Sequence, residues 1–132
     1  MKAAVILAAL ALAGQAAPAL DPALTVADFL RRWTRIEGLK EMAIVDPDMR
    51  ALGEQMGLAV GAWKAELDAD EAAGRRPRAC PVKGTTAKLE SPELLAELRA
   101  IPEEKRGMLF RDAMFAYLDK RFPCPAVTPS SP

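Results

Sequence analysis

The sequence predicts an all-α fold, a compact bundle of about four main helices held by one disulfide. Three observations indicate this fold. Apolar residues recur at intervals of three and four, no stretch alternates apolar and polar residues with a period of two, and Thr, Asp, Ser and Pro stand where helices would begin. The chain has 132 residues, a length typical of one small domain.

The first predicted helix covers residues 25–38. Thr25 is its expected N-cap, and Asp28 follows three residues later in a pattern close to a capping box. Gly38 is expected to end the helix, and the short apolar turn "LKEMAIV" follows. One helical face would be apolar and would carry Val26, Phe29, Leu30, Trp33 and Ile36.

Residues 46–74 form the longest predicted helix. Asp46 is its expected N-cap, Pro47 occupies the first helical position, and Gly74 ends the helix. The apolar positions repeat at intervals of three and four, which predicts that they face the core: Met49, Leu52, Met56, Ala59, Val60, Trp63 and Leu67.

The same helix carries three glycines at intervals of four, Gly53, Gly57 and Gly61. Each costs about 1 kcal/mol relative to alanine in a helix interior. One interpretation is drift toward small residues in a chain rich in alanine and glycine. The other is a ridge where a helix of this chain or of a partner packs on bare backbone, closest at Gly57, and the sequence leaves both open.

Two shorter helices are expected after a loop. The first begins at Ser91 and Pro92 and turns leucines toward the core. Pro102 stops it and is expected to start the last element, residues 102–122. The apolar face of that element comprises Phe110, Ala113, Met114, Tyr117 and Leu118.

The start of the chain is typical of a cleaved secretory signal. Lys2 precedes an apolar run over residues 3–13, and small residues follow. The run is shorter than the about 20 residues that a membrane span needs. We therefore expect cleavage between Ala17 and Asp21, and no membrane span afterwards.

This pattern predicts the organisation and location of the protein. Residues 1–19 form the signal peptide, residues 20–125 the helical domain and residues 126–132 a disordered tail. Bacterial export through such a signal delivers a protein to the periplasm, which is therefore the expected compartment.

The only two cysteines are Cys80 and Cys124. The periplasm is oxidising, so we expect them to be paired with each other. They stand 44 residues apart, which favours a structural bridge over a redox-active thiol pair. The chain-entropy estimate for a loop of this length is about 4 kcal/mol.

Several classes of site are excluded by composition. The sequence has no histidine, so neither a Ser-His-Asp triad nor a histidine metal site can form. Zero net charge gives no global attraction to nucleic acid. We expect no enzyme activity and no cofactor, because the carboxylate clusters look like solvated surface: Asp68, Asp70, Glu71, Glu103 and Glu104.

Basic residues crowd the loop around the first cysteine: Arg75, Arg76, Arg78 and Lys83. A solvated linker is the simpler interpretation, and contact with an anion or a partner is the alternative. Trp33 and Trp63 are residue types that anchor interfaces, but both lie on apolar helical faces, which favours core packing.

The chain resembles the Rap/Tai immunity proteins of type VI secretion amidase effectors over roughly residues 24–125. The resemblance rests on the signal peptide, the glycine-rich helix, Cys80-Pro81, the leucine helix over residues 94–102 and the terminal Phe122-Pro123-Cys124. Members often carry further cysteines in the N-terminal half, and this sequence has none there.

The resemblance implies a periplasmic inhibitor that binds a peptidoglycan amidase and occludes its active site without a cofactor. A disulfide-held helical domain is also compatible with a general periplasmic chaperone or stress protein, which is the alternative hypothesis. The sequence leaves a homodimer open as well.

Overall fold

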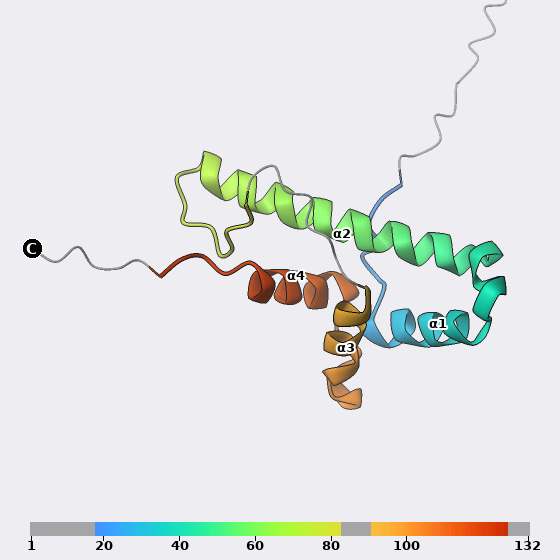
Figure 1. The fold of residues 1–132 in the computed structure, drawn as a ribbon. Helices are drawn as coiled ribbons and strands as arrows, with labels where there is room; N and C mark the ends of the chain where they lie inside the picture. Colours follow the sequence, from blue (N-terminus) through green and yellow to red (C-terminus); the bar gives the residue numbers. More distant parts are fainter. Residues whose placement is uncertain (1–17, 83–90, 127–132) are drawn as a thin grey trace, which may run out of the picture.

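The computed structural model describes residues 18–82 and 91–126 and confirms the all-α prediction. Four α-helices and two short 3-10 helices occur within these ranges, which contain no strand and one isolated β-bridge (Figure 1). The elements are α1 (Val26–Gly38), η1 (Lys40–Val45), α2 (Pro47–Ala72), α3 (Ser91–Ala100), η2 (Glu103–Lys105) and α4 (Phe110–Arg121).

The predicted caps of the first two helices are confirmed. The Thr25 hydroxyl accepts a hydrogen bond from the backbone N–H of Asp28 at 3.1 Å. The Asp46 carboxylate accepts one from the N–H of Asp48 at 2.9 Å, and Pro47 fills the first helical position. These bonds satisfy N–H groups that a helix start leaves without partners.

Helix α2 is the longest element, and α1 and α4 both pack against it (Figure 1). They lie on the same side of α2, while α3 projects away beneath them. The centre of the core is built from residues with no more than 1% exposure, which include Phe29, Leu52, Trp63, Leu94, Phe110 and Leu118. This confirms the predicted burial of Trp63, whereas Trp33 is only partly buried.

The segments that precede α1 and α4 are joined by backbone hydrogen bonds. Val26 N–H donates to the carbonyl of Met108 at 3.0 Å, and Phe110 N–H donates to the carbonyl of Leu24 at 2.8 Å. Beside this junction, the rings of Phe29 and Phe110 stack with centroids 4.4 Å apart. The two helices therefore begin side by side.

The prediction that the last helix begins near Pro102 is wrong. A 3-10 turn occupies residues 103–105, and α4 begins only at Phe110. The guanidinium of Arg106 donates hydrogen bonds to the carbonyls of Ile101 and Arg99. The carbonyl of Met108 accepts a hydrogen bond from the backbone N–H of Val26. These contacts hold the segment as a turn, and a continuous helix would break them.

The predicted glycine ridge does not pack against any helix in the described part of the chain. A Cβ atom built on Gly53, Gly57 or Gly61 would meet no other atom within 4 Å. The hypothesis that another helix of this chain approaches Gly57 closely is therefore wrong for the residues that the structure describes. Met49, expected in the core, is 39% exposed.

Part of the predicted organisation lies outside the described residues. This applies to the signal sequence up to residue 17, to residues 83–90 and to residues 127–132 of the tail. None of the helices in the described ranges combines the length and apolar character needed to cross a membrane.

Candidate functional site

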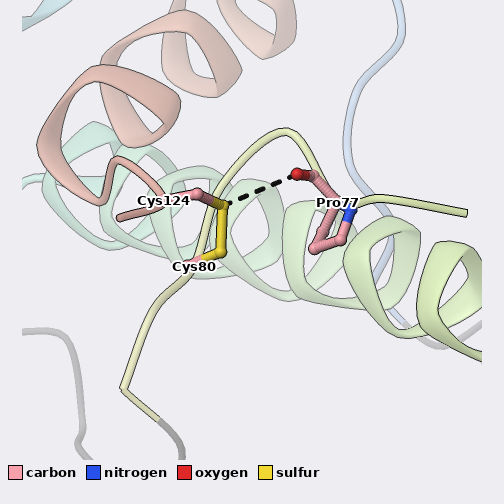
Figure 2. Close-up of a disulfide and its surroundings, with 3 residues drawn as sticks. All are labelled: Pro77, Cys80 and Cys124. Carbon is pink, nitrogen blue, oxygen red and sulfur yellow. Dashed lines mark hydrogen bonds between the residues drawn. A yellow bond between two sulfur atoms is a disulfide. The ribbon is translucent and has the colours of Figure 1, made fainter. Parts of the chain in front are cut away.

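The predicted disulfide between Cys80 and Cys124 is present, with Cα atoms 4.7 Å apart across a sequence separation of 44 (Figure 2). The Cys124 sulfur lies 3.6 Å from the carbonyl oxygen of Pro77. An oxidised sulfur has no proton to donate, so this is a close packing contact rather than a true hydrogen bond. The bridge ties the loop after α2 to the chain beyond α4.

Two further contacts reinforce this corner. The backbone N–H of Cys80 donates to the carbonyl of Phe122 at 2.9 Å. Ala79 is 1% exposed, and the rings of Trp63 and Phe122 lie 5.9 Å apart. The loop is therefore docked on the protein rather than held by the sulfur bridge alone.

Arg78 connects this loop to helices α2 and α4. Its guanidinium donates to Asp119 of α4 at 3.0 Å and to Glu66 of α2 at 2.9 Å. Asp119 also accepts the indole N–H of the buried Trp63 at 2.8 Å. Arg111 donates to the other oxygen of Glu66 at 2.6 Å, which closes the network.

Both arginines of this network also contact the ring of Phe115. The guanidinium carbons of Arg78 and Arg111 are 5.3 Å and 4.8 Å from its centroid, distances typical of cation–π contacts. Partial burial acts to lower the pKa of Arg78, but the bond to Glu66 and the charge of Asp119 outweigh it, so the pKa is raised. The network keeps Arg78 charged and fixed.

The predicted basic partner site is thus partly occupied by internal pairing. Arg75 donates to Asp70 at 3.0 Å, and Arg78 belongs to the network above. Arg76 is exposed and makes no ion pair with another described residue. Lys83 lies outside the described residues. A partner contact by this loop stays a prediction, centred on Arg76.

A second surface lies at the opposite end of α2 (Figure 1). Four large apolar side chains are exposed there, and we call them the η1 cluster: Met42 at 64%, Ile44 at 83%, Val45 at 70% and Met49 at 39%. Large exposed apolar patches often mark a contact with another molecule.

The backbone of the turn explains this exposure. Lys40 adopts a positive φ of 52°, which turns the chain sharply out of α1 into the 3-10 helix η1. Within η1, Ala43 packs on the core, while Met42, Ile44 and Val45 are left outside. No residue of this six-residue turn is fully buried.

Ion pairs lock the helices on either side of the η1 cluster. Arg32 donates to Asp48 at 2.6 Å, and Arg35 donates to Asp46 at 2.8 Å and to Asp48 at 2.9 Å. The bond from Arg32, followed by that from Arg35, lowers the pKa of Asp48 to about 2. The bond from Arg35 and the N–H of Asp48 lower the pKa of Asp46. The turn is therefore held rigidly.

Sequence reasoning identified this segment as an apolar turn but gave it no role. The available signal was the run "MAIV" directly before the N-cap Asp46, where no helical period could bury all of its side chains. Apolar composition alone does not distinguish an exposed turn from a buried one.

The described part of the chain also contains a hollow of about 230 Å³ between α3 and α4. It is smaller than typical ligand pockets. A Lys120–Glu97 ion pair of 3.0 Å lies at its edge. Burial raises the pKa of the Tyr117 hydroxyl, which lies at this hollow. Its lining is mainly apolar: Leu98, Ile101, Met108, Ala113, Ala116 and Tyr117.

The acidic clusters considered for catalysis do not converge on one site. Asp70 pairs with Arg75, while Asp68 is exposed on α2 and Glu103 and Glu104 are exposed on η2. Within the described ranges, no group of three or more acidic or cysteine side chains is placed to hold a metal ion.

No family model, curated protein or solved structure matches this chain. What the protein does must therefore be inferred from its own surfaces, of which the η1 cluster is the most exposed apolar one described.

Proposed function

We propose that this chain is an exported protein-binding domain that inhibits a cell-wall amidase effector, with the η1 cluster at the centre of the contact. The observation that carries the proposal is the exposure of Met42, Ile44 and Val45 on a turn fixed by ion pairs. The disulfide supports export, because such bridges persist in oxidising compartments.

The η1 cluster has the composition of an interface centre. Its apolar side chains would lose water on binding, and Lys40 and Glu41, which are exposed beside them, would supply a polar rim. The flanking ion pairs fix the turn before binding, which lowers the cost of ordering it in a complex.

The charges around the cluster favour a protein partner over an anionic membrane. Charges of both signs flank it, with Lys40 and Glu41 in the turn and the ion pairs of Arg32 and Arg35 with Asp46 and Asp48 beside it. Membrane-surface helices are instead rich in lysine and arginine on their polar face.

An amidase as the partner is supported by the resemblance to immunity proteins and by the shape of the turn. Enzyme active sites are concave and largely apolar, so a projecting apolar turn suits insertion into such a cleft. Inhibition by occlusion needs no catalytic group or cofactor on this chain.

The test is a pair of matched substitutions, Val45→Asp and Val82→Asp. Both valines are 70% exposed, but Val82 lies beyond the far end of α2. The purified oxidised protein should retain an amidase effector from secreted fractions and inhibit its hydrolysis of peptidoglycan. We expect Val45→Asp to abolish both effects and Val82→Asp to preserve them.

Equal inhibition by the two variants would overturn the role of the η1 cluster. Retention of many unfolded proteins, with no amidase among them and with suppression of client aggregation, would instead support the chaperone alternative. Genomic proximity to an amidase effector gene would support the inhibitor.

A further inference from the structure

The methionines of the described chain differ widely in their exposure to solvent. The η1 cluster holds two exposed ones, Met42, which is the most exposed of all, and Met49 in the first turn of α2, which is 39% exposed. Met108 before α4 is 37% exposed, whereas Met56 is partly buried and Met114 is fully buried. A dissolved oxidant reaches a thioether from solvent, so the sulfur atoms of the η1 cluster are among the most accessible.

No thiol of this chain competes with the methionines for an oxidant. The two cysteines of the sequence are joined in the Cys80–Cys124 disulfide, so the protein has no free thiol. The thioether is then the side-chain group that peroxides oxidise most readily. The disulfide also fits an oxidising compartment, where such oxidants are met. The exposed methionines are therefore the first targets of a peroxide on this protein.

The turn that carries these methionines is held by backbone bonds and by other side chains. The N–H of Met42 donates to the carbonyl of Leu39 at 3.0 Å, and the N–H of Met49 donates to the carbonyl of Asp46 at 3.1 Å. Ala43 packs on the core, and the ion pairs described above lie beside the turn. An oxygen atom added to an exposed sulfur leaves all of these contacts in place. The fold should therefore survive oxidation at this site.

We propose that Met42 and Met49 make the η1 cluster an oxidation-sensitive site whose oxidant is a peroxide. The thioether sulfur attacks one oxygen of hydrogen peroxide, so that the O–O bond breaks and an S–O bond forms. The other oxygen leaves as hydroxide and takes the proton of the transferred oxygen, which gives water. The sulfur is oxidised by two electrons to a sulfoxide, the peroxide is reduced by two, and no further reactant is needed.

The sulfoxide changes the chemistry of the cluster at two positions. A thioether is apolar, whereas a sulfoxide oxygen is a hydrogen-bond acceptor whose burial without a donor costs free energy. An apolar surface that covers the oxidised cluster would leave this oxygen without a donor. Oxidation should therefore weaken contacts made through the cluster. The consequence for amidase inhibition rests on the proposed function, whereas the site of oxidation does not.

Peptide mass mapping of the disulfide-bonded protein during treatment with hydrogen peroxide tests the site itself. We expect the sulfoxide to form first at Met42, more slowly and at similar rates at Met49 and Met108, and last at Met114. Circular dichroism should show unchanged helix content while the two methionines of the cluster are converted. Oxidation of Met114 as early as that of Met42, or loss of helix on conversion of Met42, would overturn the proposal.

Retention on a phenyl hydrophobic-interaction column tests the effect on the surface without any partner. Peroxide should shorten the retention of the wild type. The double variant Met42→Leu/Met49→Leu keeps apolar side chains of similar volume without sulfur and should lose much less retention. Met108→Leu is the matched control, because Met108 is about as exposed as Met49 but lies outside the cluster, and it should lose nearly as much as the wild type. Equal losses in the double variant and the control would contradict the proposal.

Inhibition of the amidase effector tests the functional consequence, with the peroxide removed by catalase before the enzyme is added. Treatment should raise the wild-type concentration needed for half inhibition at least about tenfold. The double variant should inhibit equally before and after treatment. Inhibition that survives conversion of both methionines would overturn this inference and leave the proposed function standing. Absence of inhibition by the untreated protein would overturn the proposed function, while mapping and retention still decide the oxidation site.

Discussion

The backbone N–H of Cys80 donates to the carbonyl of Phe122 at 2.9 Å, so the two segments joined by the disulfide are also joined by a main-chain hydrogen bond. A few residues away, Arg78 bonds to Asp119, the carboxylate that also accepts the indole N–H of Trp63. The disulfide therefore joins two segments, the loop after α2 and the chain beyond α4, that polar contacts also hold together.

Replacing Cys124 by alanine should lower the free energy of unfolding by about 2–5 kcal/mol, because the unfolded chain loses a constraint across 44 residues. Urea denaturation of oxidised wild type and variant measures the difference. The free energy of unfolding of the reduced wild type should match that of the variant. Reductant should leave the free energy of unfolding of the variant unchanged. Two free thiols in the wild type, or equal stability of both proteins, would contradict the prediction.

Asp119→Ala should lower the free energy of unfolding by about 1–3 kcal/mol. The substitution leaves the indole N–H of Trp63 without its acceptor and removes one of the two carboxylates bound by Arg78. Thermal unfolding and urea denaturation would measure the loss. Glu103→Ala, an exposed carboxylate on η2, is the control and should change stability by less than about 0.5 kcal/mol. Equal effects of the two substitutions would show that the network contributes little.

Local signals in the sequence were sufficient to predict most of the helices. Thr25 and Asp46 are caps whose side chains bond N–H groups two or three residues away, so neighbouring residues decide where α1 and α2 start. The disulfide was predictable for a different reason, since the chain offers only one intramolecular pairing.

Features that depend on distant segments were not predictable. The start of α4 is set by hydrogen bonds between Leu24 and Phe110 and between Val26 and Met108, which the spacing of apolar residues does not reveal. Arg78 was expected in a solvated linker or a partner contact, and its pairing with Glu66 and Asp119 depends on how two helices pack.

The periodicity of α2 predicted a buried face but not what covers the glycines. A row at intervals of four shows that residues share a side of the helix, and only the packing shows that this side is open to solvent. The same holds for the η1 cluster, whose apolar composition resembles that of the core while Ile44 is 83% exposed.

The pKa of Asp48 should be about 2 in the folded protein, below its usual 3.8, because Arg32 and Arg35 bond to the carboxylate. A depressed pKa stabilises the fold above the unfolded value near pH 4, and this contribution is lost as the pH falls toward 2. Carbon-detected NMR titration of the Asp48 carboxyl measures the midpoint. Arg32→Gln should move it up toward the ordinary value.

Arg31→Gln is the matched control for this titration. Arg31 lies next to Arg32 on α1 but pairs with Asp28, so its loss should leave the midpoint of Asp48 in place. A wild-type midpoint near 4, or equal shifts in the two variants, would show that the pairs beside the η1 cluster do not persist in solution.

Gly57→Ala and Gly74→Ala should change stability in opposite directions. A Cβ on Gly57 meets no atom within 4 Å, and alanine is favoured over glycine inside a helix by about 1 kcal/mol, so the substitution should stabilise the monomer by up to that amount. Gly74 has a φ of +71° just after α2, where a side chain costs about 1–2 kcal/mol. Urea denaturation would measure both changes. A loss of stability in Gly57→Ala under these conditions would mean that part of this chain packs against the outward face of α2 after all.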